Sequence, residues 1–122
     1  MTMYDGKEMM EGLIFVKSMM SLENVQKQVA EDVKYAMKAG VHCEKMLLDD
    51  SYSKSVDRDA MCKLLECLDG SEIQVLVVED IYDITRDASD LRAMMDRINA
   101  MGIIIFDLST MSARFNNYER EC

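Results

Sequence analysis

Short apolar segments alternate with amphipathic ones along this chain. Four apolar runs have the length and β-branched content of buried strands, and they cover residues 12–17, 42–48, 73–79 and 102–107. Between these runs, apolar residues recur every three or four positions, which is the spacing of one face of a helix. Strands that alternate with helices predict βαβ units, and therefore an α/β domain with a mainly parallel four-stranded sheet between helices. The runs at 12–17 and 73–79 are the most uniformly apolar, so we expect them to be the central strands.

The predicted elements fit one domain with a short segment on each side. Residues 1–11 show no clear periodicity, and we interpret them as a flexible N-terminal arm. Residues 12–112 hold every predicted strand and helix, and residues 113–122 read as a polar C-terminal tail. A chain of 122 residues can build one hydrophobic core, and the residues after Leu108 are too few for a second folded unit.

The charge balance is acidic, with 14 Lys+Arg against 23 Asp+Glu and a net charge of −9. Proteins that bind nucleic acid usually carry a basic surface, because neutralising phosphates supplies most of their non-specific affinity. Residues 79–96, which follow the third predicted strand, are themselves acidic. They contain Arg86 and Arg92 against Glu79, Asp80, Asp83, Asp87, Asp90 and Asp96. DNA binding is therefore not expected from the charge pattern.

Several common cofactor, metal and membrane signals are missing from the sequence. The chain has no apolar run near the roughly 18–20 residues that cross a bilayer, and acidic residues interrupt its N-terminal segment, so we expect a cytoplasmic protein. Its four cysteines are too scattered for a disulfide framework or a zinc site, and its single histidine, His42, stands alone beside Cys43. It has no glycine-rich phosphate loop. The sequence predicts neither a metal nor a cofactor.

A set of short motifs, taken in order, is more informative than any one of them. Phe15-Val16-Lys17 ends the first strand, Asp49 begins a serine-rich loop that leads to Asp57-Arg58, and Thr85-Arg86-Asp87 follows the third strand. This order and spacing resembles the catalytic domain of the resolvase/invertase family of serine recombinases, over about residues 12–108. The resemblance implies a resolvase-like three-layer domain.

The resemblance also implies where the nucleophile would be. The family's first strand ends in Tyr-x-Arg-x-Ser, and this pattern falls on Phe15, Lys17 and Met19. The attacking serine is thus replaced by a thioether. Ser18 and Ser21 are the nearby candidates for a relocated nucleophile. Alternation along the strand points Ser18 away from Lys17, however, and Ser21 is better explained as a helix N-cap.

The family's phosphate-binding cations correspond to Lys17, Arg58 and Arg86. We expect these three side chains to converge on one anion-binding pocket, because functional loops gather at the carboxyl ends of parallel strands. The alternative is that they are separate surface charges. Beside them the family's Asp-Arg pair has become Tyr82-Asp83. A carboxylate at a site that must stabilise negative charge opposes the family's chemistry.

These departures favour a catalytically degenerate domain, a pseudoenzyme that acts through protein association in the context of DNA recombination. Its expected partner is its own copy or a related recombinase, and the methionines Met19, Met20 and Met111 would suit such contacts if exposed. One alternative is an active site-specific recombinase, a serine-type strand-exchange enzyme with a relocated serine. Another is a small anion-binding module built on the three cations.

Overall fold

The computed structural model describes residues 2–4 and 7–114 of the chain. Its strands are β1 (Thr2–Tyr4), β2 (Lys7–Lys17), β3 (Val41–Asp49), β4 (Val75–Val78), β5 (Ile104–Asp107) and β6 (Ser112–Arg114). Its helices are α1 (Leu22–Lys38), α2 (Asp59–Leu68), α3 (Ala88–Ala100) and the short 3-10 helix η1 (Ile81–Asp83). None of the described helices is long and apolar enough to span a membrane.

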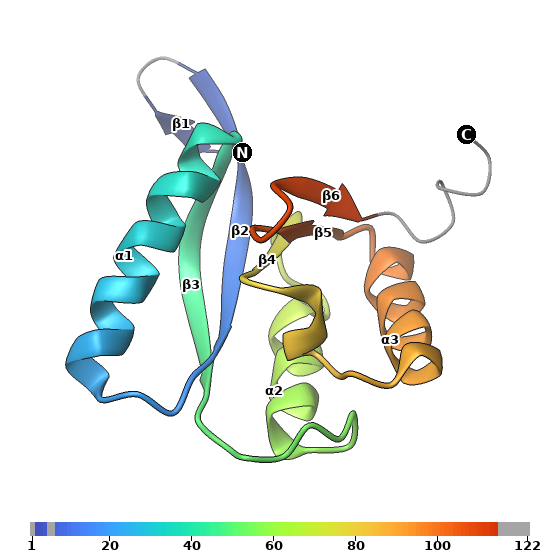
Figure 1. Ribbon diagram of the computed structural model, residues 1–122. Coiled ribbons are helices and arrows are strands. Elements are labelled where there is room, and N and C mark those ends of the chain that lie inside the picture. The colour runs from blue at the N-terminus through green and yellow to red at the C-terminus, as the bar shows by residue number, and fades with distance from the viewer. Residues whose placement is uncertain (1, 5–6, 115–122) are drawn as a thin grey trace.

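The four predicted strands form a parallel sheet in the order β3-β2-β4-β5. The first and third predicted strands are its two central members, as their uniform apolar content indicated. Two short strands extend the sheet in the antiparallel sense, with β1 pairing with the start of β2 and β6 pairing with β5. The helices follow the strands in the alternating order that the hydrophobic pattern predicted (Figure 1).

The N-terminal part of the sheet is longer than the sequence pattern predicted. Strand β2 begins at Lys7 rather than at residue 12, so residues 7–11 lie in the sheet instead of in a loose arm. Met9 and Glu11 are buried there, although the polar residues between the apolar ones hid the strand in the sequence. At the other end, β6 takes up residues 112–114, and residues 115–122 of the expected tail lie outside the described residues.

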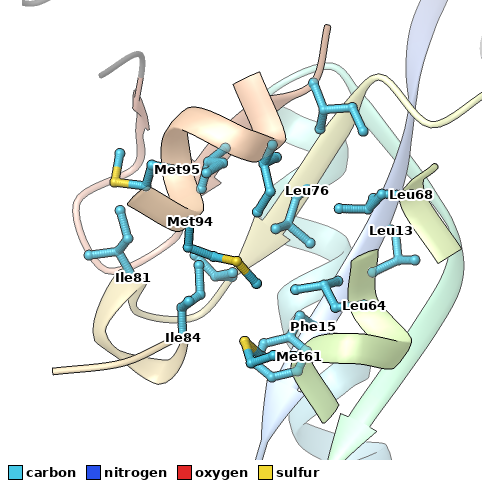
Figure 2. Packing of buried hydrophobic residues seen from close by; sticks show 14 of the residues in the cluster. Leu13, Phe15, Met61, Leu64, Leu68, Leu76, Ile81, Ile84, Met94 and Met95 are labelled. Carbon is cyan, nitrogen blue, oxygen red and sulfur yellow. The ribbon is translucent and has the colours of Figure 1, made fainter. Parts of the chain in front are cut away.

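Alternate residues of the central strands face opposite layers of helix. Leu13 and Phe15 of β2 belong to the larger core cluster, which includes Leu64 of α2 and Met94 of α3 (Figure 2). The intervening residues of β2 pack in a second cluster with Ala36 of α1. Because side chains alternate along a strand, α1 covers one face of the sheet while α2 and α3 cover the other (Figure 1). The domain therefore has the three layers that the resemblance implied.

Candidate functional site

Parallel pairing brings the last residues of β2 and β3 together at the carboxyl edge of the sheet. Lys17 and Asp49 are partners in the register of these two strands. The Lys17 Nζ lies 3.3 Å from the Asp49 Oδ2, and the amide of Ser18 donates to the Asp49 backbone oxygen at 3.0 Å. The strand register therefore places Lys17 and Asp49 side by side at the loops where the sequence predicted a site.

Asp49 also binds the buried guanidinium of Arg58. The Arg58 Nε donates to the Asp49 Oδ2 at 2.7 Å, and the two side chains are only 4% and 2% exposed. Burial by itself would raise the pKa of the Asp49 carboxyl, but hydrogen bonds from the Ser51 hydroxyl and amide, and then from Arg58 and Lys17, hold that pKa at about 2. Asp49 is thus an ionised counter-ion shared by two cations.

The remaining donors of Arg58 bind main-chain oxygens. Nη1 donates to the carbonyls of Ser55 and Ile84, and Nη2 donates to the carbonyl of Asp83. These bonds tie the loop before α2 to the turn that follows β4. An arginine offers five N–H donors in a fixed plane, so this arrangement uses nearly all of them inside the protein. Arg58 therefore acts as a clamp between two loops.

The ammonium of Lys17 is similarly satisfied. Besides Asp49, its Nζ donates to the carbonyl oxygens of Ser51 at 2.7 Å and Ser53 at 2.9 Å. Three acceptors match the three protons of an ammonium group. Lys17 thus holds the serine-rich loop against the end of β2.

Arg86 differs from the other two predicted cations. Its side chain is exposed, and within the described part of the chain no hydrogen bond or ion pair joins it to Lys17 or Arg58. The structure brings Lys17 and Arg58 together on one oxygen of Asp49, while convergence of all three cations stays a prediction.

The two serine candidates both have roles in the local backbone. The Ser21 side chain accepts from the amide of Asn24 at 3.4 Å, and it caps α1 as the sequence predicted. The Ser18 Oγ accepts from the amide of Met20 at 3.2 Å in the same loop. Met19 lies between the two serines with its side chain exposed.

An acidic cluster formed by Asp32, Glu79 and Asp83 lies where β4 meets α1. Burial and then the neighbouring Glu79, through a hydrogen bond and its charge, raise the pKa of Asp32 to about 8. Burial, followed by the charges of Glu79 and Asp80, raises the pKa of Asp83 to about 6. Gln28 of α1 donates to Glu79. Ionisation of Asp32 and Asp83 is therefore disfavoured, first by burial and then by the neighbouring carboxylates.

Sequence reasoning identified the acidic residues after β4 but missed Asp32. This residue lies in the middle of α1, among other polar residues of a helix whose outer face is charged. Its meeting with Glu79 depends on how α1 packs across the sheet, and no local spacing in the sequence signals that contact.

A surface pocket of about 470 Å³ opens beside the Asp49–Arg58 pair. Its charged lining residues are Asp49, Asp50, Arg58, Asp59 and Lys63. Because carboxylates outnumber cations here, and Arg58 is already bound to Asp49, the pocket does not favour an anion.

Residues 17–120 match the family described as resolvase, N-terminal domain. The chain belongs to the resolvase family. No curated protein matches the sequence closely enough to serve as a relative.

Solved structures with the same fold come from catalytic domains of serine recombinases and related proteins. The N-terminal catalytic domain of TP901-1 integrase is 17% identical with a TM-score of 0.69, and the match covers 91% of this chain and 97% of that one. The C-terminal catalytic domain of ISC1926 TnpA, an IS607-like serine recombinase, is 19% identical with a TM-score of 0.68, covering 81% and 69%. A resolvase family site-specific recombinase from Streptococcus pneumoniae is 10% identical with a TM-score of 0.64, covering 85% and 75%.

This resolvase-family chain therefore has the fold of these catalytic domains. The loop after β2 carries the exposed thioether of Met19. The turn after β4 carries Asp83, whose carboxyl lies near those of Glu79 and Asp80. Both residues follow the carboxyl ends of central strands, the edge where ligands of such sheets bind.

Proposed function

We propose that this resolvase-family chain is a catalytically degenerate serine-recombinase domain that acts by associating with its own copies or with a related recombinase. The observation that carries the proposal is the acidic cluster of Asp32, Glu79 and Asp83, which includes a position that corresponds to a phosphate-binding arginine. The pKa of two of its three carboxyls is raised, first by burial and then by the neighbouring carboxylates, so this region already disfavours negative charge. Bringing a phosphate dianion or a DNA backbone to them would add to that repulsion.

The cations that remain also support the proposal. Lys17 and Arg58 are bound to Asp49 and to main-chain carbonyls, so the protein has already neutralised or satisfied most of their donors. A transition state that gathers negative charge requires donors that are aimed at it and free to bind it. Replacing one such donor in an enzyme typically slows the reaction about 10²–10³-fold, and here several groups are lost or engaged together.

The surface at the end of β2 fits a role in association. Met19, Met20 and Leu22 lie almost consecutively before and at the start of α1, and all three side chains are exposed. Exposed methionines adapt to irregular partner surfaces because their side chains are flexible and polarisable. Met111, which the sequence also marked for this role, is exposed as well.

A strand-cleavage assay tests the catalytic half of the proposal. The native chain and Met19→Ser would be incubated at low salt with a library of supercoiled plasmids that carry random inserts, because the preferred site is unknown. Denaturing gels and sequencing of protein-linked fragments would detect a covalent adduct. We expect no adduct from either protein.

An adduct with the native chain would overturn the proposal in favour of the alternative, a serine recombinase with a relocated nucleophile. Ser18→Ala and Ser21→Ala would then identify the attacking residue. An adduct with Met19→Ser alone would show that only the nucleophile was lost and that the acidic cluster tolerates a phosphate.

A further inference from the structure

We propose that Glu11, His42 and Glu44 form a binding site for a divalent transition-metal ion such as Zn²⁺. One ligand atom from each residue lies within 4.8 Å of the other two. His42 is near the start of β3, whereas Asp49 ends that strand, so the two regions are roughly 23 Å apart at 3.3 Å per residue. The metal site is therefore separate from the recombinase-type site.

The pairing of β2 with β3 places these residues together. Glu11 is the partner of His42 in the parallel register, which joins residues far apart in the sequence. The register then shifts, with Gly12 opposite Cys43 but Leu13 opposite Lys45, so Glu44 is the extra residue of a β-bulge. Bulges redirect the side chain of the extra residue, and they are common beside functional sites. Glu44 thus lies two residues after His42, with its Oε1 3.9 Å from the His42 Nδ1.

The distances among the three groups suit coordination better than hydrogen bonding. The His42 Nδ1 lies 3.6 Å from the Glu11 Oε2 and 3.9 Å from the Glu44 Oε1. A direct N–H···O hydrogen bond would be about 2.7–3.2 Å long. Tetrahedral Zn²⁺ with bonds of 2.0–2.2 Å sets its ligand atoms about 3.4 Å apart. Small rotations, above all of the exposed Glu44, would therefore complete the three protein ligands.

Two of the proposed ligand atoms are buried and have no hydrogen-bond partner. The Glu11 side chain is only 9% exposed, yet its Oε2 has no hydrogen-bond partner, and neither has the His42 Nδ1. Burying a carboxylate oxygen without a partner is costly, so such atoms usually pair with a cation or a metal. A divalent ion would satisfy both atoms at once.

Glu11 is also held in position before any ion arrives. Its amide donates to the Gln74 side-chain oxygen at 3.0 Å, and its carbonyl accepts from the Gln74 amide at 2.8 Å. Contacts of this kind fix a ligand's backbone and reduce the entropy lost on binding.

An imidazole with carboxylates favours zinc and similar ions over magnesium or calcium, which prefer oxygen ligands alone.

Calorimetric titration of the chelator-treated protein with Zn²⁺ tests the site. We expect one equivalent to bind, with the dissociation constant raised at least tenfold in Glu11→Gln, His42→Gln and Glu44→Gln. Thermal unfolding should shift to higher temperature with Zn²⁺ in the native chain and much less in the variants. Glu44→Gln keeps the test decisive if either other variant fails to fold, because Glu44 is exposed.

Two controls separate this site from adventitious binding. Glu66→Gln, an exposed acid on α2, should leave the affinity unchanged. The exposed thiols of Cys62 and Cys67 could also attract zinc, so Cys62→Ser/Cys67→Ser should bind as the native chain does. The proposal is overturned if Zn²⁺ does not saturate one site, if the three ligand variants bind undiminished, or if only the cysteine variant loses binding.

Discussion

Arg58 and Asp49 form a buried ion pair that joins the loop before α2 to the end of β3, with the Arg58 Nε 2.7 Å from the Asp49 Oδ2. In the motif that the family resemblance implies, the arginine at this position serves the phosphate. In this chain the same guanidinium binds a carboxylate and three carbonyl oxygens of the protein itself. Arg58 therefore stabilises the fold by holding these loops together, whether or not it also serves a site.

Asp49→Asn should destabilise the domain by about 3 kcal/mol, because removing one partner of a buried ion pair leaves the other charge uncompensated. Urea denaturation at neutral pH measures this change. The matched control is Asp50→Asn, since Asp50 is the exposed neighbour and should change stability by no more than about 0.5 kcal/mol. Equal effects of the two substitutions would show that the pair contributes little.

The acidic cluster predicts an unusual dependence of stability on pH. The pKa of Asp32 is raised from 3.8 to about 8 in the folded protein, and that of Asp83 to about 6. Between the unfolded pKa of 3.8 and these folded values, the two carboxyls hold protons in the folded state that the unfolded chain has released. The stability that these protons contribute is therefore full below about pH 4 and is lost as the pH rises towards 8. We expect the free energy of unfolding to fall over this range.

Asp32→Asn should flatten that decline and should be more stable than the native chain at pH 8, because the amide carries no charge at any pH. Urea titrations at several pH values from 4.5 to 8.5 would measure both effects. Asp59→Asn, which removes an exposed acid from α2, is the control and should leave the slope as it is. A native chain whose stability rises with pH over this range would contradict the prediction.

The sequence predicted the architecture well because the central strands are continuous and apolar. It missed the start of β2, since Lys7, Glu8 and Glu11 interrupt the apolar residues in a strand that begins in a hairpin. Contacts between neighbouring strands and between the sheet and a helix could not be predicted from the sequence either. His42 looked isolated because Glu11 reaches it only through strand pairing, and Asp32 meets Glu79 only through the packing of α1.

Gly12 is required by the close approach of β2 to β3. A Cβ at this position would lie 2.5 Å from the Cγ1 of Val41, well inside van der Waals contact. Gly12→Ala should therefore cost about 2 kcal/mol of stability, the usual effect of overpacking a core. In a double-mutant cycle, Gly12→Ala/Val41→Ala should be at least about 1 kcal/mol more stable than the two separate effects predict, since the second change removes the clash. Strict additivity would show that Val41 moves aside.

The exposed methionines at the end of β2 lead to the last prediction, which concerns self-association. Sedimentation velocity of the native chain should show a concentration-dependent shift to larger species. Fully burying a Met side chain contributes about 1.5–3 kcal/mol, and Met19 and Met20 are already half covered, so each would add about 1 kcal/mol at an interface. Met19→Gln/Met20→Gln should therefore weaken association roughly 10- to 50-fold.

Met46→Gln provides the matched control, because Met46 is a comparably exposed methionine on β3 and not in the loop after β2. It should leave the dissociation constant unchanged if the interface is centred on that loop. Equal weakening by both variants would instead place the interface elsewhere or make it diffuse. A strict monomer at the highest attainable concentration would end the idea of self-association. A co-sedimentation experiment with an active serine recombinase would then test the other partner, and the same Met19→Gln/Met20→Gln variant should lose that contact because its apolar area is gone.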